Sequence, residues 1–159
     1  VSQHLPGIDG VVIVTTPQEV ALLDSRKSIN FAKTISVPVL GVLENMSGFN
    51  ISGNGEPNSI ISIQAPTGSP IDCNINEDGN WSVTLDIFKS GGGEEASKEL
   101  LVPYLGSLPF DPGIVRGGDD GVHRIISVPD GDTAKAFNKI IERINEELEK
   151  SQDSTISIT

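Results

Sequence analysis

The segment with the clearest chemical potential is Lys89-Ser90, followed by the three glycines Gly91 to Gly93. Glycine-rich loops hold phosphates with backbone N–H groups, and a lysine and a hydroxyl residue after the glycines complete such a site. Here the lysine precedes the glycines, and no Gly-x-x-x-x-Gly-Lys-Ser/Thr sequence occurs in the 159 residues. We therefore predict a turn and a helix start, in preference to an anion site at the helix N-terminus.

Asn45 is a second residue that could bind a ligand, because it follows an apolar segment, Val37 to Leu43, that is typical of a buried strand. Ligands of open α/β sheets bind at the carboxyl ends of strands, and an amide offers a donor and an acceptor in one plane. Asparagine is also common in turns. On its residue type alone, Asn45 is expected to be a turn or cap residue.

Metal chemistry has little support in the residues. Cys73 is the single cysteine, and its alternation with apolar neighbours predicts a place in a core, which leaves it a weak metal candidate. His4 and His123 are far apart and lack ligand spacing. Asp119-Asp120, between two glycines, fits a solvated loop. We expect no metal site.

Composition excludes several classes of function. The chain has 11 basic and 22 acidic residues, a net charge of -11, so a phosphate-backbone partner is disfavoured and nucleic acid binding is not expected. One cysteine excludes an internal disulfide, and no apolar run approaches the roughly 20 residues that span a bilayer. No charged-then-apolar leader precedes Val1, so secretion is not expected.

Outside the middle of the chain, strands alternate with helices, which predicts a parallel, doubly wound α/β sheet. The expected strands are Val11–Val14, Val37–Leu43 and Tyr104–Leu108; the expected helices run from about Pro17 to Lys33, Glu94 to Leu101 and Asp132 to Lys150. Thr16 and Glu19 fit a Thr-x-x-Glu capping box for the first helix. We expect residues 151–159 to be a disordered tail.

The middle, residues 51–85, has the period-two pattern of antiparallel strands. Three successive apolar runs show it: Ile61 and Ile63; Ile71, Cys73 and Ile75; Trp81, Val83 and Leu85. Asp78-Gly79 supplies a hairpin turn. We predict a three-stranded meander, inserted between the two parts (residues 1–50 and 86–150) of an α/β half-domain. The amino-acid sequence of this segment is similar to that of the middle strands of bacterial immunoglobulin-like repeats. Such a small sheet needs cover from the parent domain or a partner.

Linked segments of the chain together resemble one known family. They are Asp9–Val14, Thr15–Val20, Glu44–Phe49, Ile87–Gly93 and Val102–Pro112. In this order and spacing, over residues 5 to 50 and 86 to 148, the chain resembles the C-terminal half of the Mrp-type iron-sulfur cluster carriers, ATPases of the MinD-like P-loop class. The resemblance implies a partial P-loop NTPase-like fold and a cytoplasmic setting.

The resemblance also implies an ATP site, in which the Asn45 side chain would bond the adenine edge. The residues that would line the base are Pro109, Phe110, Asp111 and Pro112. Thr15, Thr16 and Asp24 would lie near the nucleotide and the dimer face, although we treat them as structural first. The phosphate loop of such a protein would lie upstream of Val1, so the chain resembles a half-protein in which ATP binding is weak or absent.

The cluster chemistry of the family depends on thiolates that are missing here. Members place a C-x-x-C shortly after Met-Ser-Gly-Phe, and two subunits contribute these pairs to one bridging cluster. In this chain Phe49 is followed by Asn50, Ile51, Ser52 and Gly53, and the predicted meander occupies the place of the cysteines. We therefore expect no iron-sulfur cluster in this chain.

Three hypotheses follow. The first is an ATP-binding iron-sulfur carrier, represented by its C-terminal half, inactive alone and acting as a homo-oligomer or with a complementing N-terminal half. The second is a non-enzymatic scaffold or binding module, a natural fusion or recombined chimera of an Mrp-like half with a β insert. The third is a regulator that binds adenine nucleotide without hydrolysing it. None of them involves nucleic acid or a membrane.

Overall fold

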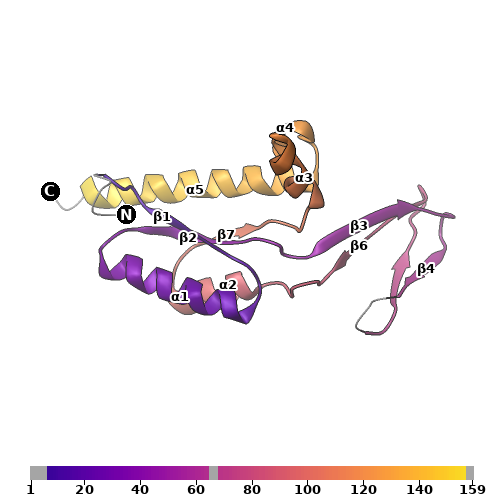
Figure 1. Cartoon of the computed structure of the whole chain (residues 1–159), viewed down its shortest axis with the longest axis horizontal. Coiled ribbons are helices and arrows are strands. Elements are labelled where there is room, and N and C mark those ends of the chain that lie inside the picture. Colours follow the sequence, from indigo (N-terminus) through magenta and orange to yellow (C-terminus); the bar gives the residue numbers. More distant parts are fainter. Residues whose placement is uncertain (1–6, 65–67, 157–159) are drawn as a thin grey trace.

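The computed structural model describes residues 7–64 and 68–156. Its body is an α/β unit in which three parallel strands form a sheet in the order β1-β2-β7, with helices on both faces (Figure 1). The elements of the body are β1 (Val11–Thr15), α1 (Glu19–Thr34), β2 (Val39–Glu44), α2 (Gly92–Leu100), β7 (Tyr104–Ser107), α3 (Pro112–Asp120), α4 (Arg124–Ser127) and α5 (Asp132–Ile156). The predicted α/β class is confirmed.

The sheet lies between α5 on one face and α1 with α2 on the other (Figure 1). Leu43, Leu105, Leu108 and Ile140 form the core cluster between the sheet and α5. β2 is the central strand and is buried from Leu40 onwards because helices cover both faces of the sheet (Figure 1), which explains its continuous apolar sequence. In the described part of the chain, no helix is long and apolar enough to cross a membrane.

The remaining strands form an arm, residues 49–85, that projects from one end of the body (Figure 1). Its strands are β3 (Phe49–Asn54), β4 (Ile60–Ile63), β5 (Ile71–Asn74) and β6 (Asn80–Leu85). β3 pairs with β6 and β4 with β5, both antiparallel, in two separate two-stranded sheets. The predicted three-stranded meander is therefore wrong in two respects, since the described residues of the arm form four strands and β5 does not pair with β6 among them.

Gly53 is the reason that β3 escapes a pattern search. It occupies an inward position where an apolar side chain would be expected, between Ile51 and the end of the strand. The ring of Trp81, on the paired strand, fills the space above it, and a Cβ on Gly53 would lie 2.7 Å from Trp81 Cζ2. An aromatic ring across a glycine restores the missing apolar contact.

The predicted capping box at Thr16 is wrong. α1 begins at Glu19, and its N-cap residue Gln18 makes no side-chain cap bond. The first helical bond runs from Leu22 N to the Gln18 carbonyl, so Thr16 lies too far before the first turn to cap it. The Glu19 carboxylate pairs instead with Arg26 at 3.2 Å.

Two segments expected to be irregular are helical. α5 continues beyond Lys150 to Ile156, because no proline or glycine ends it, so the predicted disorder is wrong for residues 151–156. Residues 157–159 lie outside the described part. Asp119 and Asp120 are the last residues of α3, and Gly121 (φ 69°) ends that helix in the left-handed region, where glycine carries no steric penalty.

Candidate functional site

A buried carboxylate, Glu44 at the end of β2, joins the two sequence blocks that flank the arm. Its side chain is 0% exposed. Oε1 accepts hydrogen bonds from Ser47 Oγ (2.6 Å) and Gly91 N (3.0 Å), and Oε2 accepts from Gly93 N (2.6 Å). Backbone N–H groups at a helix N-terminus lack intrahelical partners and favour negative charge. Glu44 therefore fixes the start of α2 against the loop that follows β2.

The glycines at the start of α2 allow this close approach. A Cβ on Gly92 would lie 2.7 Å from Leu22 Cδ1 and 3.1 Å from the Pro17 carbonyl oxygen, and one on Gly93 would lie 3.0 Å from Glu44 Cβ. Side chains at these positions would push α2 away from α1 and β2. The Glu44 carboxylate thus already holds backbone donors that an external phosphate would need.

Asn45 follows Glu44 at the carboxyl end of the sheet. Its backbone N donates to the Thr15 carbonyl of β1 at 2.7 Å, and its Oδ1 accepts from Met46 N at 2.9 Å. Met46 has a left-handed backbone (φ 59°), so the loop turns sharply here. Oδ1 keeps a second lone pair, and Nδ2 makes no hydrogen bond within the described residues. Asn45 is thus both a turn residue and a free donor.

Two surface hollows share Asn45. The first, of about 440 Å³, lies over β1 and the start of α1 and includes the predicted residues Thr15, Thr16 and Asp24. The second, of about 540 Å³, lies between Leu108 and the helices α3, α4 and α5. Both open at the carboxyl ends of parallel strands, the usual place for ligands in such sheets.

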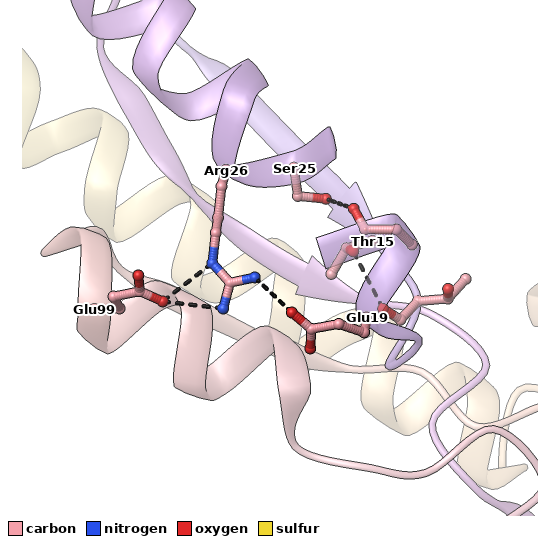
Figure 2. A network of polar contacts seen from close by, with 7 residues as sticks. Thr15, Glu19, Ser25, Arg26 and Glu99 are labelled. Atoms are coloured by element: carbon pink, nitrogen blue, oxygen red, sulfur yellow. Dashed lines mark hydrogen bonds and ion pairs between the residues drawn. The ribbon is translucent and has the colours of Figure 1, made fainter. Parts of the chain in front are cut away.

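Hydroxyl groups in the first hollow differ in their availability. Thr15 Oγ1 donates to the Thr16 carbonyl at 3.2 Å and Ser25 Oγ donates to the Ala21 carbonyl at 2.9 Å, so both are engaged by the backbone (Figure 2). Among the described residues, Thr16 Oγ1 is the one buried side-chain polar atom with no hydrogen-bond partner. A buried unpaired hydroxyl is costly, which makes it the group in this hollow that most needs a partner.

Arg26 connects α1 to α2. Figure 2 shows its guanidinium between Glu99 of α2 and Glu19 of α1. Nε and Nη2 each lie 3.0 Å from Glu99 Oε2, and Nη1 lies 3.2 Å from Glu19 Oε1. The bond to Glu99, more than that to Glu19, raises the pKa of Arg26 above its ordinary value. The bridge holds the two helices together on this face of the sheet.

The predicted base-lining residues, 109–112, do not share a hollow with Asn45. Pro109, Phe110, Asp111 and Pro112 line a smaller one, of about 180 Å³, beside the base of the arm. Arg124 and Thr133 line both this hollow and the second Asn45 hollow. The residues therefore lie in adjacent hollows.

Phe110 closes the base of the arm. Its ring meets Phe49 edge to face at a centroid distance of 5.7 Å and Phe88 at 6.2 Å. Phe110 N also donates to the Gly48 carbonyl at 2.7 Å. Edge-to-face pairs of this kind add to the free energy of burial, so the Phe110 side chain is already used inside the fold.

Asp111 ties three helices together. Oδ1 accepts from Gly113 N (2.7 Å) and caps α3, while Oδ2 accepts from Arg124 Nε (2.8 Å) and from Thr133 Oγ1 (2.7 Å). Burial acts to raise the pKa of Asp111, but the bonds from Arg124, Thr133 and Gly113 outweigh it and hold the pKa below its ordinary value. The carboxylate stays charged and structural.

The residues present do not fit an iron-sulfur cluster. Cys73 is half-buried, and its Sγ donates to the Ser82 carbonyl at 3.3 Å; full burial was expected, but the small sheets of the arm cover it only in part. Within residues 7–64 and 68–156, no three His, Cys, Asp or Glu side chains gather as a metal site. Clusters are usually held by four thiolates.

Comparison with known sequences identifies the protein family of the chain. Residues 1–69 and 73–145 match the family described as "ParA: NUBPL iron-transfer P-loop NTPase". The chain belongs to this family. It is 37% identical over 153 residues to an iron-sulfur cluster carrier protein of Methanocaldococcus jannaschii, covering 96% of this chain and 43% of the relative. Over 143 residues it is 40% identical to an iron-sulfur cluster carrier protein of a Synechocystis species, in a match that covers 90% of this chain and 33% of that relative.

Solved structures agree on the fold. The cell division ATPase MinD of Pyrococcus furiosus matches with a TM-score of 0.54 at 22% identity, over 87% of this chain and 43% of that one. MinD of Pyrococcus horikoshii, solved with Mg-ADP, matches with a TM-score of 0.56 at 20% identity, over 90% of this chain and 44% of that one. The chain of this ParA family member therefore spans less than half the length of the curated relatives and structures it matches.

Sequence reasoning missed Glu44, Arg124 and Thr133 as site residues. Glu44 lay inside the recognised block, but its partners are 47 and 49 positions away, so no local pattern could reveal them. A glutamate that ends an otherwise apolar strand was the available signal, since a buried carboxylate needs donors.

Proposed function

We propose that this chain supplies the base-binding part of a nucleotide site in an iron-sulfur cluster carrier of the ParA family. The observation that carries the proposal is the position of Asn45, whose Nδ2 is free at the carboxyl end of the sheet, between two hollows. Membership of a P-loop NTPase family supports a nucleotide as the ligand. We also propose a cytoplasmic setting, as the sequence resemblance implies.

The proposed site assigns a role to each group. Asn45 Nδ2 donates to a ring nitrogen on the adenine edge, and the second lone pair of its Oδ1 accepts from the exocyclic amino group of the base. The buried Thr16 hydroxyl, which has no partner in the described residues, bonds the nucleotide from the β1 side. The loop of Pro109, Phe110, Asp111 and Pro112 flanks the base from the adjacent hollow. Phosphate binding requires a phosphate loop, which these 159 residues do not contain.

The test is a ¹H–¹⁵N NMR titration of the chain with ATP, observing the Asn45 side-chain amide. We expect this signal and those around Thr16 to shift, with weak affinity. Asn45→Ala should weaken binding about tenfold or more, because it removes two hydrogen bonds to the base, each worth about 0.5–1.5 kcal/mol. Asn138→Ala, a matched change at an exposed site on α5, should leave binding unchanged. Equal binding by wild type and Asn45→Ala would remove Asn45 from the site.

We further propose that β1 is completed by another α/β segment. Within the described residues β1 is an edge strand, and Val14 on it is 58% exposed. Open strand edges are normally covered. A complementing N-terminal half that bears a phosphate loop suits this edge. Co-expression with the upstream half of the Methanocaldococcus jannaschii relative should yield a co-purifying pair, whereas Val14→Lys should prevent it.

For the cluster, we propose that a single copy of this chain binds none. The cysteine pair expected after Phe49 is absent, and Cys73 is the only thiol. Anaerobic reconstitution with iron and sulfide should give no charge-transfer band near that of the full-length Synechocystis relative, used as a positive control. A stoichiometric band that Cys73→Ser abolishes would overturn this part of the proposal.

A second candidate function is that of a binding module. The arm supports it, because it projects from the body (Figure 1) at the place where the cysteine pair was expected. A chain with this role would bind its partners equally well when nucleotide binding is weakened by Asn45→Ala.

A further inference from the structure

Three basic residues of α5 form a row that internal contacts do not explain. Lys135, Lys139 and Arg143 recur every four residues, so they share one side of the helix, and all three are exposed. In the described part of the chain none pairs with a carboxylate; Arg143 Nη1 donates to the Leu105 carbonyl at 3.0 Å. Like charges four residues apart destabilise a helix, and acidic residues outnumber basic ones by 22 to 11. The row therefore points to an acidic ligand outside the body.

The row flanks a groove along β7, of about 450 Å³, which we call the β7 groove. Its wall is the strand Tyr104–Ser107, an edge of the described sheet that pairs with β2 on one side. Its floor is narrow and apolar at Gly106, where a Cβ would lie 3.3 Å from Ile140 Cγ1. Of the described residues that line it, Asp132 alone carries a carboxylate.

The open strand edge and the basic row together favour an extended, acidic polypeptide segment as the ligand of the β7 groove. An added strand would lie about 4.8 Å beyond β7, beside the row on α5. Its backbone would pair with the open strand edge, which is how sheets bind extended peptides, and carboxylates on it would meet Lys135, Lys139 and Arg143. A compact anion would use the charges but leave the strand edge unpaired.

The chain itself carries an acidic β element, the arm. Residues 49–85 contain four carboxylates, on Glu56, Asp72, Glu77 and Asp78, and no lysine, arginine or histidine. β3 and β4 each pair on one side only within the described residues, so the arm also has open strand edges. Its half-buried apolar faces need further cover, as a small sheet generally does.

An arm cannot easily fill the groove of its own chain. It projects away from the body (Figure 1). Among the described residues its strands pair with one another alone, and at its base Asn50 Nδ2 donates to Asp132 Oδ2 at 3.3 Å. We propose that the β7 groove receives the acidic arm of a second copy, in a head-to-tail contact. The groove of the second copy then remains open to a third.

The test is analytical ultracentrifugation of the chain without nucleotide, which separates this contact from any nucleotide-dependent dimer. The weight-average mass should rise with protein concentration and fall with added salt, because exposed charge pairs are screened beyond about 10 Å at 0.1 M ionic strength. A contact between unlike surfaces need not stop at two copies, so the mass should pass that of a dimer at the highest concentrations.

Charge reversals locate the contact. Lys135→Glu with Lys139→Glu should leave a monomer, and so should Asp72→Lys with Glu77→Lys in the arm. Mixing the two double variants should restore association, since the intact arm of the first meets the intact groove of the second, and the reversed charges of the other arm and groove also complement one another. The matched control for the first variant is Lys89→Glu with Arg116→Glu, which changes net charge equally at exposed sites outside the groove and should still associate.

Two results would overturn the proposal. One is a monomer at every concentration and salt level. The other is association that persists in either double variant, or that the control variant loses equally, because the contact would then lie elsewhere or depend only on net charge. Circular dichroism of each variant shows whether a lost contact reflects a lost fold, and the restored mixture excludes that explanation directly.

Discussion

Glu44→Gln tests whether the buried carboxylate holds the body together. The substitution keeps the size of the side chain but replaces one acceptor oxygen by an NH₂ group. If the amide oxygen faces Ser47 and Gly91, the NH₂ group opposes Gly93 N, where the carboxylate makes a 2.6 Å bond. If the amide is flipped, the NH₂ group opposes Gly91 N. Either orientation leaves one backbone donor without its acceptor.

The expected loss follows from these contacts. An unpaired buried donor costs about 1–3 kcal/mol, and the lost negative charge at the N-terminus of α2 adds about 0.3–1 kcal/mol. The free energy of unfolding should therefore fall by about 1.5–4 kcal/mol, which is a large part of the roughly 5–15 kcal/mol typical of a domain. For a chain of this length the midpoint of thermal unfolding should fall by roughly 3–15 °C.

Urea unfolding followed by far-UV circular dichroism measures this loss. Glu142→Gln makes the same chemical change at an exposed site on α5 and should alter stability by no more than about 0.5 kcal/mol. Ser47→Ala removes one donor but keeps both backbone bonds to Glu44, so its effect should be about 0.5–1.5 kcal/mol. If Glu44→Gln is as stable as Glu142→Gln, the carboxylate does not hold α2.

Two other changes test neighbouring features. The pKa of Asp111 is lower in the folded chain than its unfolded value of about 3.9, so its stabilisation is full above that pH and is lost as pH falls through the folded pKa. Asp111→Asn should therefore lower stability at pH 7 and flatten its decline below about pH 4, measured by urea unfolding at stepped pH; an unchanged acid limb would contradict this. Gly93→Ala should destabilise by about 1–3 kcal/mol, whereas Gly118→Ala, in open space on α3, should be neutral or stabilising by up to about 1 kcal/mol; equal effects would show that contact with Glu44 is unimportant.

The strands of the body were predictable because a strand that is buried on both faces of a sheet consists of consecutive apolar residues. Val11–Val14 and Val37–Leu43 are apolar runs with few alternatives, and the observed strands β1 and β2 lie within a residue or two of them. The same reasoning found α2 and the start of α5. The structure of these elements depends on their own residues and on packing against the sheet, so the local sequence pattern was sufficient to predict them.

The errors arose where distant residues decide the local structure. Trp81 replaces a side chain that Gly53 lacks, so β3 was missed until its partner strand was in place. Thr16 has the composition of a cap, but the helix begins nearer Gln18. For the candidate site, Asn45 was placed correctly after a strand, whereas its separation from the hollow of residues 109–112 depends on how Phe110 packs.

The closed base of the arm has a consequence for how such chains can change. Phe49 pairs with Leu85, and Phe110 packs on Phe49, so the two ends of the arm meet at a fixed distance whatever lies between them. Lengthening a loop whose ends are already held together costs only about 0.6 kcal/mol for each doubling. The arm could therefore be replaced by a different module, in evolution or by design, without changes in the body. This position is thus an insertion site at which new binding specificities can be added.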